Sequence, residues 1–160
     1  MLAFALSLAM TTGADAKLTI YSYQASALLP RQSHLFATLE RGGKTQTISW
    51  MPAKDNRGKV LAVDGRNWTL DKTMTHAKSI DATISTFGPY QVDARIVDAF
   101  AARVKELESG QLKYTVLDNV RSKRAVCCVT AVGGIQPGFI HGVSFGDGAA
   151  RDVVKHLKLR

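Results

Sequence analysis

Two adjacent cysteines, Cys127 and Cys128, are the only thiols in the sequence and its strongest candidate nucleophiles. Neighbouring cysteines rarely form a disulfide with each other, because the ring closed by that bond is strained against the trans peptide. Both side chains can instead pack as small hydrophobic groups. Alternatively, Cys128 begins a helix, where free backbone N–H groups and the positive end of the helix dipole favour a thiolate. The basic residues Arg121, Lys123 and Arg124 would strengthen this second interpretation.

A thiolate nucleophile needs a proton acceptor, and histidine commonly serves as one. The sequence contains four histidines: His34, His76, His141 and His156. We expect His156 on the polar side of a helix and His76 at an exposed helical position, while His141 in a loop stays a second candidate. His34 lies in a predicted strand, which can hold a side chain rigidly toward a packed helix. His34 is therefore the candidate general base, and a structural histidine is the alternative.

A β-hairpin is predicted to position His34. Residues 33–40 and 45–50 alternate in polarity on either side of Gly42-Gly43, a pair typical of a two-residue turn. This turn would place Thr38 opposite Thr47 and Phe36 opposite Ser49, so that His34 shares a face with Thr47 and Ser49. A third polar group should orient His34; both hydroxyls and Gln24 remain open for that role.

The strongest helix prediction covers residues 93–109. Asp93 is a suitable N-cap, and Gly110 is the expected residue after the end of the helix. Apolar residues form one stripe along it: Val97, Phe100, Ala101, Val104 and Leu107.

The remaining elements are predicted with weaker signals. Strands are predicted at 17–23, at 82–87 ending before Gly88-Pro89, and at 112–117. Helices are predicted at about 69–79, capped by Asn67 or Thr69, and around 149–157. Residues 52–67 are interpreted as a loop holding a short strand, and 125–132 as a short helix or strand. The fold class is therefore α+β, an antiparallel sheet with packed helices.

The order of these residues suggests a family. A strand histidine in Ser33-His34-Leu35-Phe36, a hairpin, and then Cys127-Cys128-Val129-Thr130 resemble the circularly permuted papain-like hydrolases and acyltransferases, including the lecithin retinol acyltransferase-like group. Cys127 and Thr130 stand where that family has Asn and a second His. The resemblance implies a possible permuted papain-like fold, with Cys128 as nucleophile and His34 as base. The implied chemistry is attack on an amide or ester carbonyl through a thioester.

The first sixteen residues have the pattern of a signal peptide. The apolar run from Leu2 to Met10 precedes Ala14-Asp15-Ala16, a small-x-small cleavage pattern. That run is shorter than the roughly 20 residues that span a bilayer as a helix. We therefore expect an exported protein, periplasmic or extracellular, with residues 17–160 as a single globular α+β domain. A buried terminal helix is the alternative, because no basic residue precedes Asp15.

The net charge of +8 at pH 7 allows several kinds of partner. Basic residues occur in short groups along the whole chain without interleaved aromatic residues, so no specific nucleic-acid site is predicted. The expected partner is a cell-envelope substrate or an anionic polymer, and a non-catalytic exported binding domain is the alternative function. Gly42-Gly43-Lys44-Thr45 lacks the first glycine of a phosphate loop, since position 38 is Thr38. No metal-ligand spacing occurs, so neither a metal nor a cofactor is expected.

Overall fold

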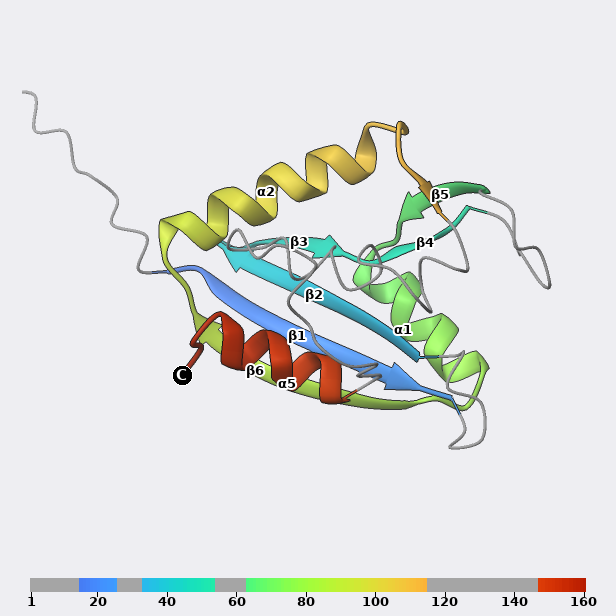
Figure 1. Ribbon diagram of the computed structural model, residues 1–160, viewed down its shortest axis with the longest axis horizontal. Helices are drawn as coiled ribbons and strands as arrows, with labels where there is room; N and C mark the ends of the chain where they lie inside the picture. The colour runs from blue at the N-terminus through green and yellow to red at the C-terminus, as the bar shows by residue number, and fades with distance from the viewer. Residues whose placement is uncertain (1–14, 26–32, 54–62, 115–146) are drawn as a thin grey trace, which may run out of the picture.

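A four-stranded antiparallel sheet forms the centre of the structure (Figure 1), in the order β3-β2-β1-β6. The computed structural model describes residues 15–25, 33–53, 63–114 and 147–160. The strands span Lys17–Gln24 (β1), Ser33–Arg41 (β2), Lys44–Ile48 (β3) and Thr83–Gln91 (β6). Together with the three helices of the described ranges, they confirm the predicted α+β class.

The predicted hairpin is present with the predicted register. Thr38 pairs with Thr47, and Gly42 and Gly43 both have positive φ, of 56° and 73°. Such φ values are those of a type I′ turn, whose twist matches that of the flanking strands. The predicted second strand was too long, however, because β3 ends at Ile48.

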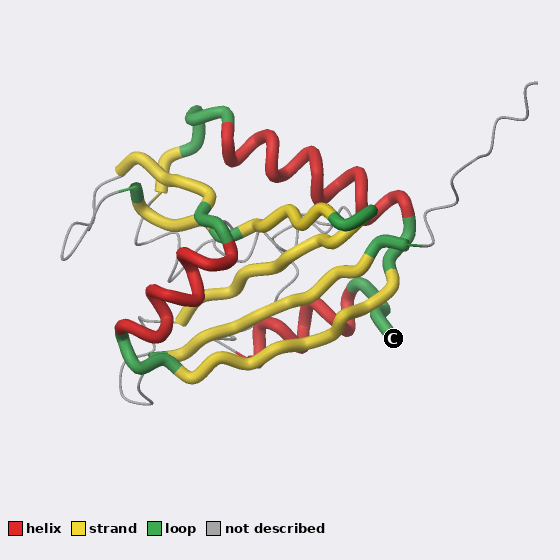
Figure 2. Tube along the Cα trace, turned by 180° about the vertical axis from the view of Figure 1, so that it is seen from behind, coloured by secondary structure: helices red, strands yellow, loops and turns green. Residues whose placement is uncertain are grey.

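A second, smaller sheet begins directly after Ser49. It contains β4 (Trp50–Pro52), β5 (Val63–Asn67) and β7 (Lys113–Tyr114), in the order β4-β5-β7. The chain therefore leaves the hairpin at Ser49 and enters the second sheet at Trp50. The tube view shows this small sheet at one end of the molecule, next to the end of the longest helix (Figure 2).

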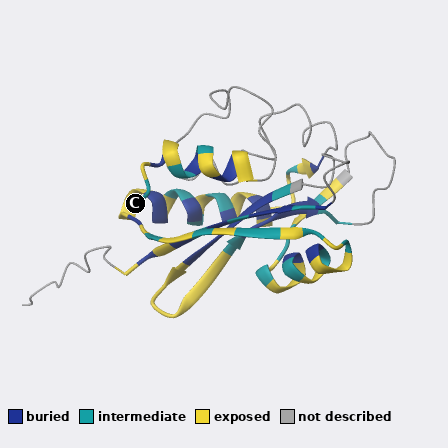
Figure 3. Ribbon diagram, turned by 90° about the horizontal axis from the view of Figure 1, so that it is seen from below, coloured by how far each residue is buried: buried dark blue, intermediate teal, exposed yellow. Residues whose placement is uncertain are grey.

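Two helices cover one face of the large sheet. Figure 3 shows α2 (Ala94–Glu108) and α5 (Asp147–His156) on the same side. The buried side chains of this face include Leu18, Ile20, Leu35, Ala37, Leu39, Ile48, Val97, Phe100, Val104, Leu107, Ala149, Ala150 and Val153. They belong to the larger of the two hydrophobic clusters found among the described residues, and we call this side the α2/α5 face. Within the described ranges, no helix is long and apolar enough to cross a membrane.

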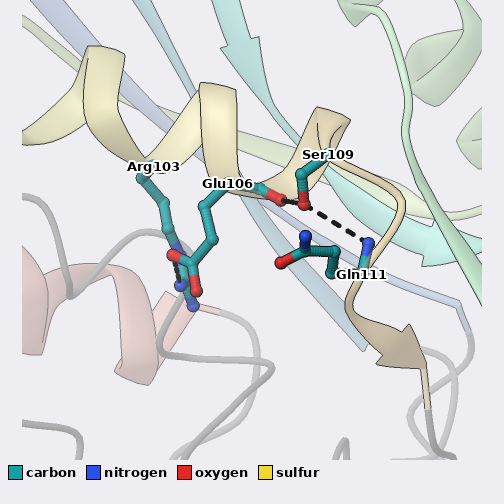
Figure 4. A network of polar contacts seen from close by, with 4 residues as sticks. All are labelled: Arg103, Glu106, Ser109 and Gln111. Atoms are coloured by element: carbon teal, nitrogen blue, oxygen red, sulfur yellow. Dashed lines mark hydrogen bonds and ion pairs between the residues drawn. The ribbon is translucent and has the colours of Figure 1, made fainter.

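Both ends of α2 carry the predicted capping groups. The Asp93 carboxylate accepts a hydrogen bond from the Ile96 N–H at 3.0 Å. At the other end, the Ser109 hydroxyl donates to the Glu106 carbonyl and accepts from the Gln111 N–H (Figure 4). Gly110 follows with φ of 74°, a left-handed conformation that glycine adopts without a steric penalty.

The opposite face of the sheet is covered at one end by α1 (Leu70–Ser79), as Figure 3 shows. Thr69, one of the two predicted caps, accepts a hydrogen bond from the Lys72 N–H. The buried residues Tyr23, Phe36 and Ala77 form the centre of a second hydrophobic cluster, with Leu70, Met74, Ile80, Ala82 and Ile84 packed against it. We call this side the α1 face.

Strand β6 continues past the point where the sequence predicted its end. The pairing with β1 shifts register between Leu18 and Ile20, so that Gly88-Pro89 is accommodated as an irregularity. In the large sheet β6 pairs with β1 and with no other described strand. An edge strand tolerates a proline because one side of it need not donate to the ladder.

Candidate functional site

His34 is held on β2, directly beside β1, where it pairs with Tyr23. The partly buried imidazole ring lies among aromatic rings on the α1 face. Its centroid is 5.4 Å from that of Tyr23 and 5.7 Å from that of Phe36, and the Phe36 ring is nearly parallel to it. The strand and these rings together fix the position of His34, as the sequence predicted for a strand histidine.

The polar partner of His34 is Ser49, at the break between β3 and β4. The His34 Nε2 and the Ser49 Oγ are 3.0 Å apart, which confirms that the two residues share a face. Ser49 is fully buried. Its backbone N–H donates to the Asn67 Oδ1 at 2.8 Å, and its carbonyl accepts from the Trp68 N–H at 2.8 Å. Every polar group of Ser49 therefore has a partner.

The Asn67 amide also connects the two sheets. Its Nδ2 donates to the Thr47 carbonyl at 2.7 Å, while its Oδ1 accepts from Ser49. The amide thus takes over hydrogen bonds that the interrupted β-ladder no longer supplies at this point. This explains how β3 can end at Ile48 without leaving the Ser49 N–H unpaired in the interior.

Thr73, on α1, extends the hydrogen bonds beyond Ser49. The Ser49 Oγ and the Thr73 Oγ1 are 2.8 Å apart, and the Thr73 hydroxyl donates to the Thr69 carbonyl at 2.9 Å. Thr73, like Ser49, has no exposed surface. Residues from β2, the β3–β4 break and α1 therefore meet in one row of hydrogen bonds. We call His34, Ser49 and Thr73 the polar row.

The surroundings of His34 favour its neutral form. Burial of the ring, with a smaller contribution from repulsion by His76, lowers the pKa of His34 to about 3, from an ordinary value of 6.5. Burial likewise raises the pKa of the neighbouring Tyr23 phenol, which stays protonated. At neutral pH the imidazole is therefore uncharged and keeps one nitrogen lone pair that can accept a proton.

His76 lies at the rim of this region rather than on the outer side of the helix. It is partly buried, and its ring centroid is 5.4 Å from the Trp68 ring and 6.2 Å from the Tyr23 ring. Lys72 Nζ lies 4.3 Å from the centroid of Trp68. The expectation that His76 is exposed was therefore wrong, because α1 turns that residue toward β1.

The structure brings together some of the predicted site residues. His34 and Ser49 are in contact, Thr47 lies on the same hairpin, and His156 is exposed on α5 as expected. Gln24 pairs with Ser33 on the neighbouring strand and has no hydrogen bond to His34 among those found between described residues. Cys127, Cys128 and His141 lie outside the described residues.

Thr73 and Asn67 are the site residues that the sequence did not identify. Asn67 was considered only as a helix cap, and Thr73 only as part of a predicted helix. The one available signal is the spacing of Thr69 and Thr73. A threonine four residues after the N-cap can return its hydroxyl to the capping residue's carbonyl.

The described residues contain no group of three or more His, Cys, Asp or Glu side chains that could hold a metal ion. Searches of protein-family models, curated proteins and solved structures found no match to the chain. The function is therefore inferred from the polar row and from the candidate residues identified in the sequence.

Proposed function

We propose that the protein is an exported cysteine-dependent hydrolase or acyl transferase that acts on amide or ester bonds. In this proposal His34 is the general base and Cys128 the nucleophile. The hydrogen bond of His34 to Ser49, continued to Thr73 in the interior, is the observation that supports it. A partly buried imidazole with one nitrogen fixed by a polar partner has the arrangement that general bases need.

The reaction would proceed through a thioester. The Cys128 sulfur attacks the carbonyl carbon while His34 accepts the thiol proton. Collapse of the tetrahedral intermediate breaks the carbon–nitrogen or carbon–oxygen bond, and His34 returns the proton to the leaving amine or alcohol. Water then hydrolyses the thioester, or an acceptor nucleophile takes the acyl group.

The low pKa of His34 is compatible with this role when the thiolate is close. A neutral imidazole is the form that accepts a proton, and a neighbouring negative charge would raise the pKa of His34 by favouring the imidazolium. The proposal therefore requires Cys128 to reach the ring from the α1 side of the sheet.

Cysteine alkylation tests the proposal. The rate of labelling by a thiol-alkylating reagent at neutral pH should be highest at Cys128, because neutral His34 accepts the thiol proton as the sulfur attacks. The substitution His34→Ala should reduce that rate about a hundredfold or more, in line with the usual contribution of a general base. The rate should be nearly unchanged in Cys127→Ala and in His156→Ala, which removes an exposed histidine.

Two results would overturn the proposal. One is that neither cysteine labels in the native protein, and the other is that His34→Ala labels as fast as the wild type. Either result would favour the alternative of a non-catalytic binding domain for an anionic envelope polymer or a protein partner.

A further inference from the structure

The direction of the hydrogen bonds in the polar row follows from the number of hydrogens available. Three contacts are made: His34 Nε2 with Ser49 Oγ, Ser49 Oγ with Thr73 Oγ1, and Thr73 Oγ1 with the Thr69 carbonyl. A carbonyl cannot donate, so the Thr73 hydroxyl uses its single hydrogen on Thr69.

The remaining donors are then determined in turn. With its hydrogen on Thr69, Thr73 can only accept from Ser49. Ser49 therefore donates its own single hydrogen to Thr73 and can only accept from His34. Each of the three contacts then has one hydrogen. In the reverse direction only two hydrogens would serve the three contacts, and the Thr73–Thr69 contact would lack one.

We propose that Ser49 and Thr73 are positioning residues that hold neutral His34 with its proton on Nε2. The acceptor lone pair then lies on Nδ1. This inference rests on the proposed function only where it makes Nδ1 the atom that takes the Cys128 proton. The tautomer itself is a property of the folded chain, because the two buried hydroxyls of Ser49 and Thr73 connect His34 to the backbone of helix α1.

Helix α1 is well suited to fix this direction. Thr73 lies one helical turn after the N-cap Thr69, and the Thr69 carbonyl also accepts the Thr73 N–H at 3.0 Å. The acceptor at the end of the row is therefore part of the helix backbone and does not rotate. A hydroxyl that donates to a fixed carbonyl transmits its orientation to the next hydroxyl, and so to the ring.

Nitrogen NMR of the full chain with labelled histidine tests the tautomer directly. The wild-type spectrum at neutral pH should show His34 with a protonated Nε2 and an unprotonated Nδ1. Thr73→Val should shift the population toward the other tautomer, since valine keeps the shape of threonine but cannot accept from Ser49. Thr73→Ser should restore the wild-type spectrum. Thr75→Val, at an exposed position of the same helix, is the matched control and should change nothing.

Cysteine labelling provides the second measurement. Thr73→Val should slow labelling of Cys128 about five- to tenfold, the effect expected from losing one neutral hydrogen bond, and Thr73→Ser should recover the rate. If Thr73→Val does not fold, Ser49→Ala and the wild-type spectrum serve the same purpose. A wild-type His34 protonated on Nδ1, or a tautomer unchanged in Thr73→Val, would overturn the inference. Failure of the proposed function is recognised separately, by unchanged labelling in His34→Ala.

Discussion

The two faces of the central sheet are built from different chemistry. The α2/α5 face is filled mainly by aliphatic side chains, with Phe100, Trp50 and Tyr114 as buried aromatic residues and Ser22 as a buried polar strand residue. The α1 face combines aromatic rings with His34 and the buried hydroxyl residues Ser49 and Thr73. On the α2/α5 face, the packing depends mainly on how well the side-chain volumes fill the interior. On the α1 face, the arrangement depends on which atom donates each hydrogen bond.

This difference has an energetic meaning. Burying aliphatic surface stabilises the fold roughly in proportion to area. Burying hydroxyl and imidazole groups costs free energy that their hydrogen bonds largely offset, so they add little net stability. The first face therefore supports the fold, and the second holds a defined arrangement of proton donors and acceptors. Substitutions on the two faces should accordingly affect different measurements.

Truncating Phe100 should have the largest effect on stability. Phe100 has no exposed surface and lies in the α2 stripe that packs on the sheet. Phe100→Ala should lower the free energy of unfolding by about 3–5 kcal/mol, the usual cost of removing a buried aromatic side chain. Urea denaturation followed by circular dichroism measures this change.

A second phenylalanine provides the matched control. Phe87 on β6 is only partly buried against the same cluster, so Phe87→Ala should cost clearly less than Phe100→Ala. Equal losses at the two positions would contradict the expectation that the cost follows how deeply each ring is buried in this cluster.

The next largest effect is the pH dependence that His34 confers. Its pKa in the folded chain is about 3, against 6.5 ordinarily. The unfolded chain therefore binds a proton more tightly between these values, and stability is lost as the pH falls through that window. The contribution of His34 should make the free energy of unfolding about 2 kcal/mol lower at pH 5 than at pH 7.

Urea denaturation at both pH values checks this expectation. His34→Gln removes the titrating ring and should flatten the difference between pH 5 and pH 7. His156→Gln, at an exposed position on α5, should leave the difference unchanged. A pH dependence that persists in His34→Gln would mean that the ring is better solvated than its contacts indicate.

Much of the fold was predictable because its signals are local. The glycine pair fixed the hairpin register, and Asp93, Gly110 and the apolar stripe fixed α2. The errors arose where tertiary contacts decide. The break at Ser49 depends on the Asn67 amide from a distant strand, and β6 passes Gly88-Pro89 because it lies beside β1 with a shifted register.

The site was predictable only in part. Alternation along the hairpin placed His34 and Ser49 on one face, because a strand repeats every two residues. No local pattern shows that α1 brings Thr73 against Ser49, since the two residues come from different elements and meet only through packing. The inward direction of His76 was missed for the same reason.

The smallest expected effect concerns a polar clamp on the α2/α5 face. The Asp147 carboxylate, at the start of α5, accepts from the Ser22 hydroxyl at 2.5 Å and from the Ser85 hydroxyl at 3.0 Å. These two hydrogen bonds, first that from Ser22, lower the pKa of Asp147 below its ordinary value of 3.8. The clamp therefore stabilises the fold above that value, and its contribution is lost as the pH falls below it.

Because Asp147 is exposed, Asp147→Asn should cost less than about 1 kcal/mol at neutral pH. The difference in free energy of unfolding between Asp147→Asn and the wild type should shrink in acid. The control is Asp98→Asn, a substitution at an exposed position on α2. A loss as large in acid as at neutral pH would show that Asp147 acts through packing of α5 and not through its charge.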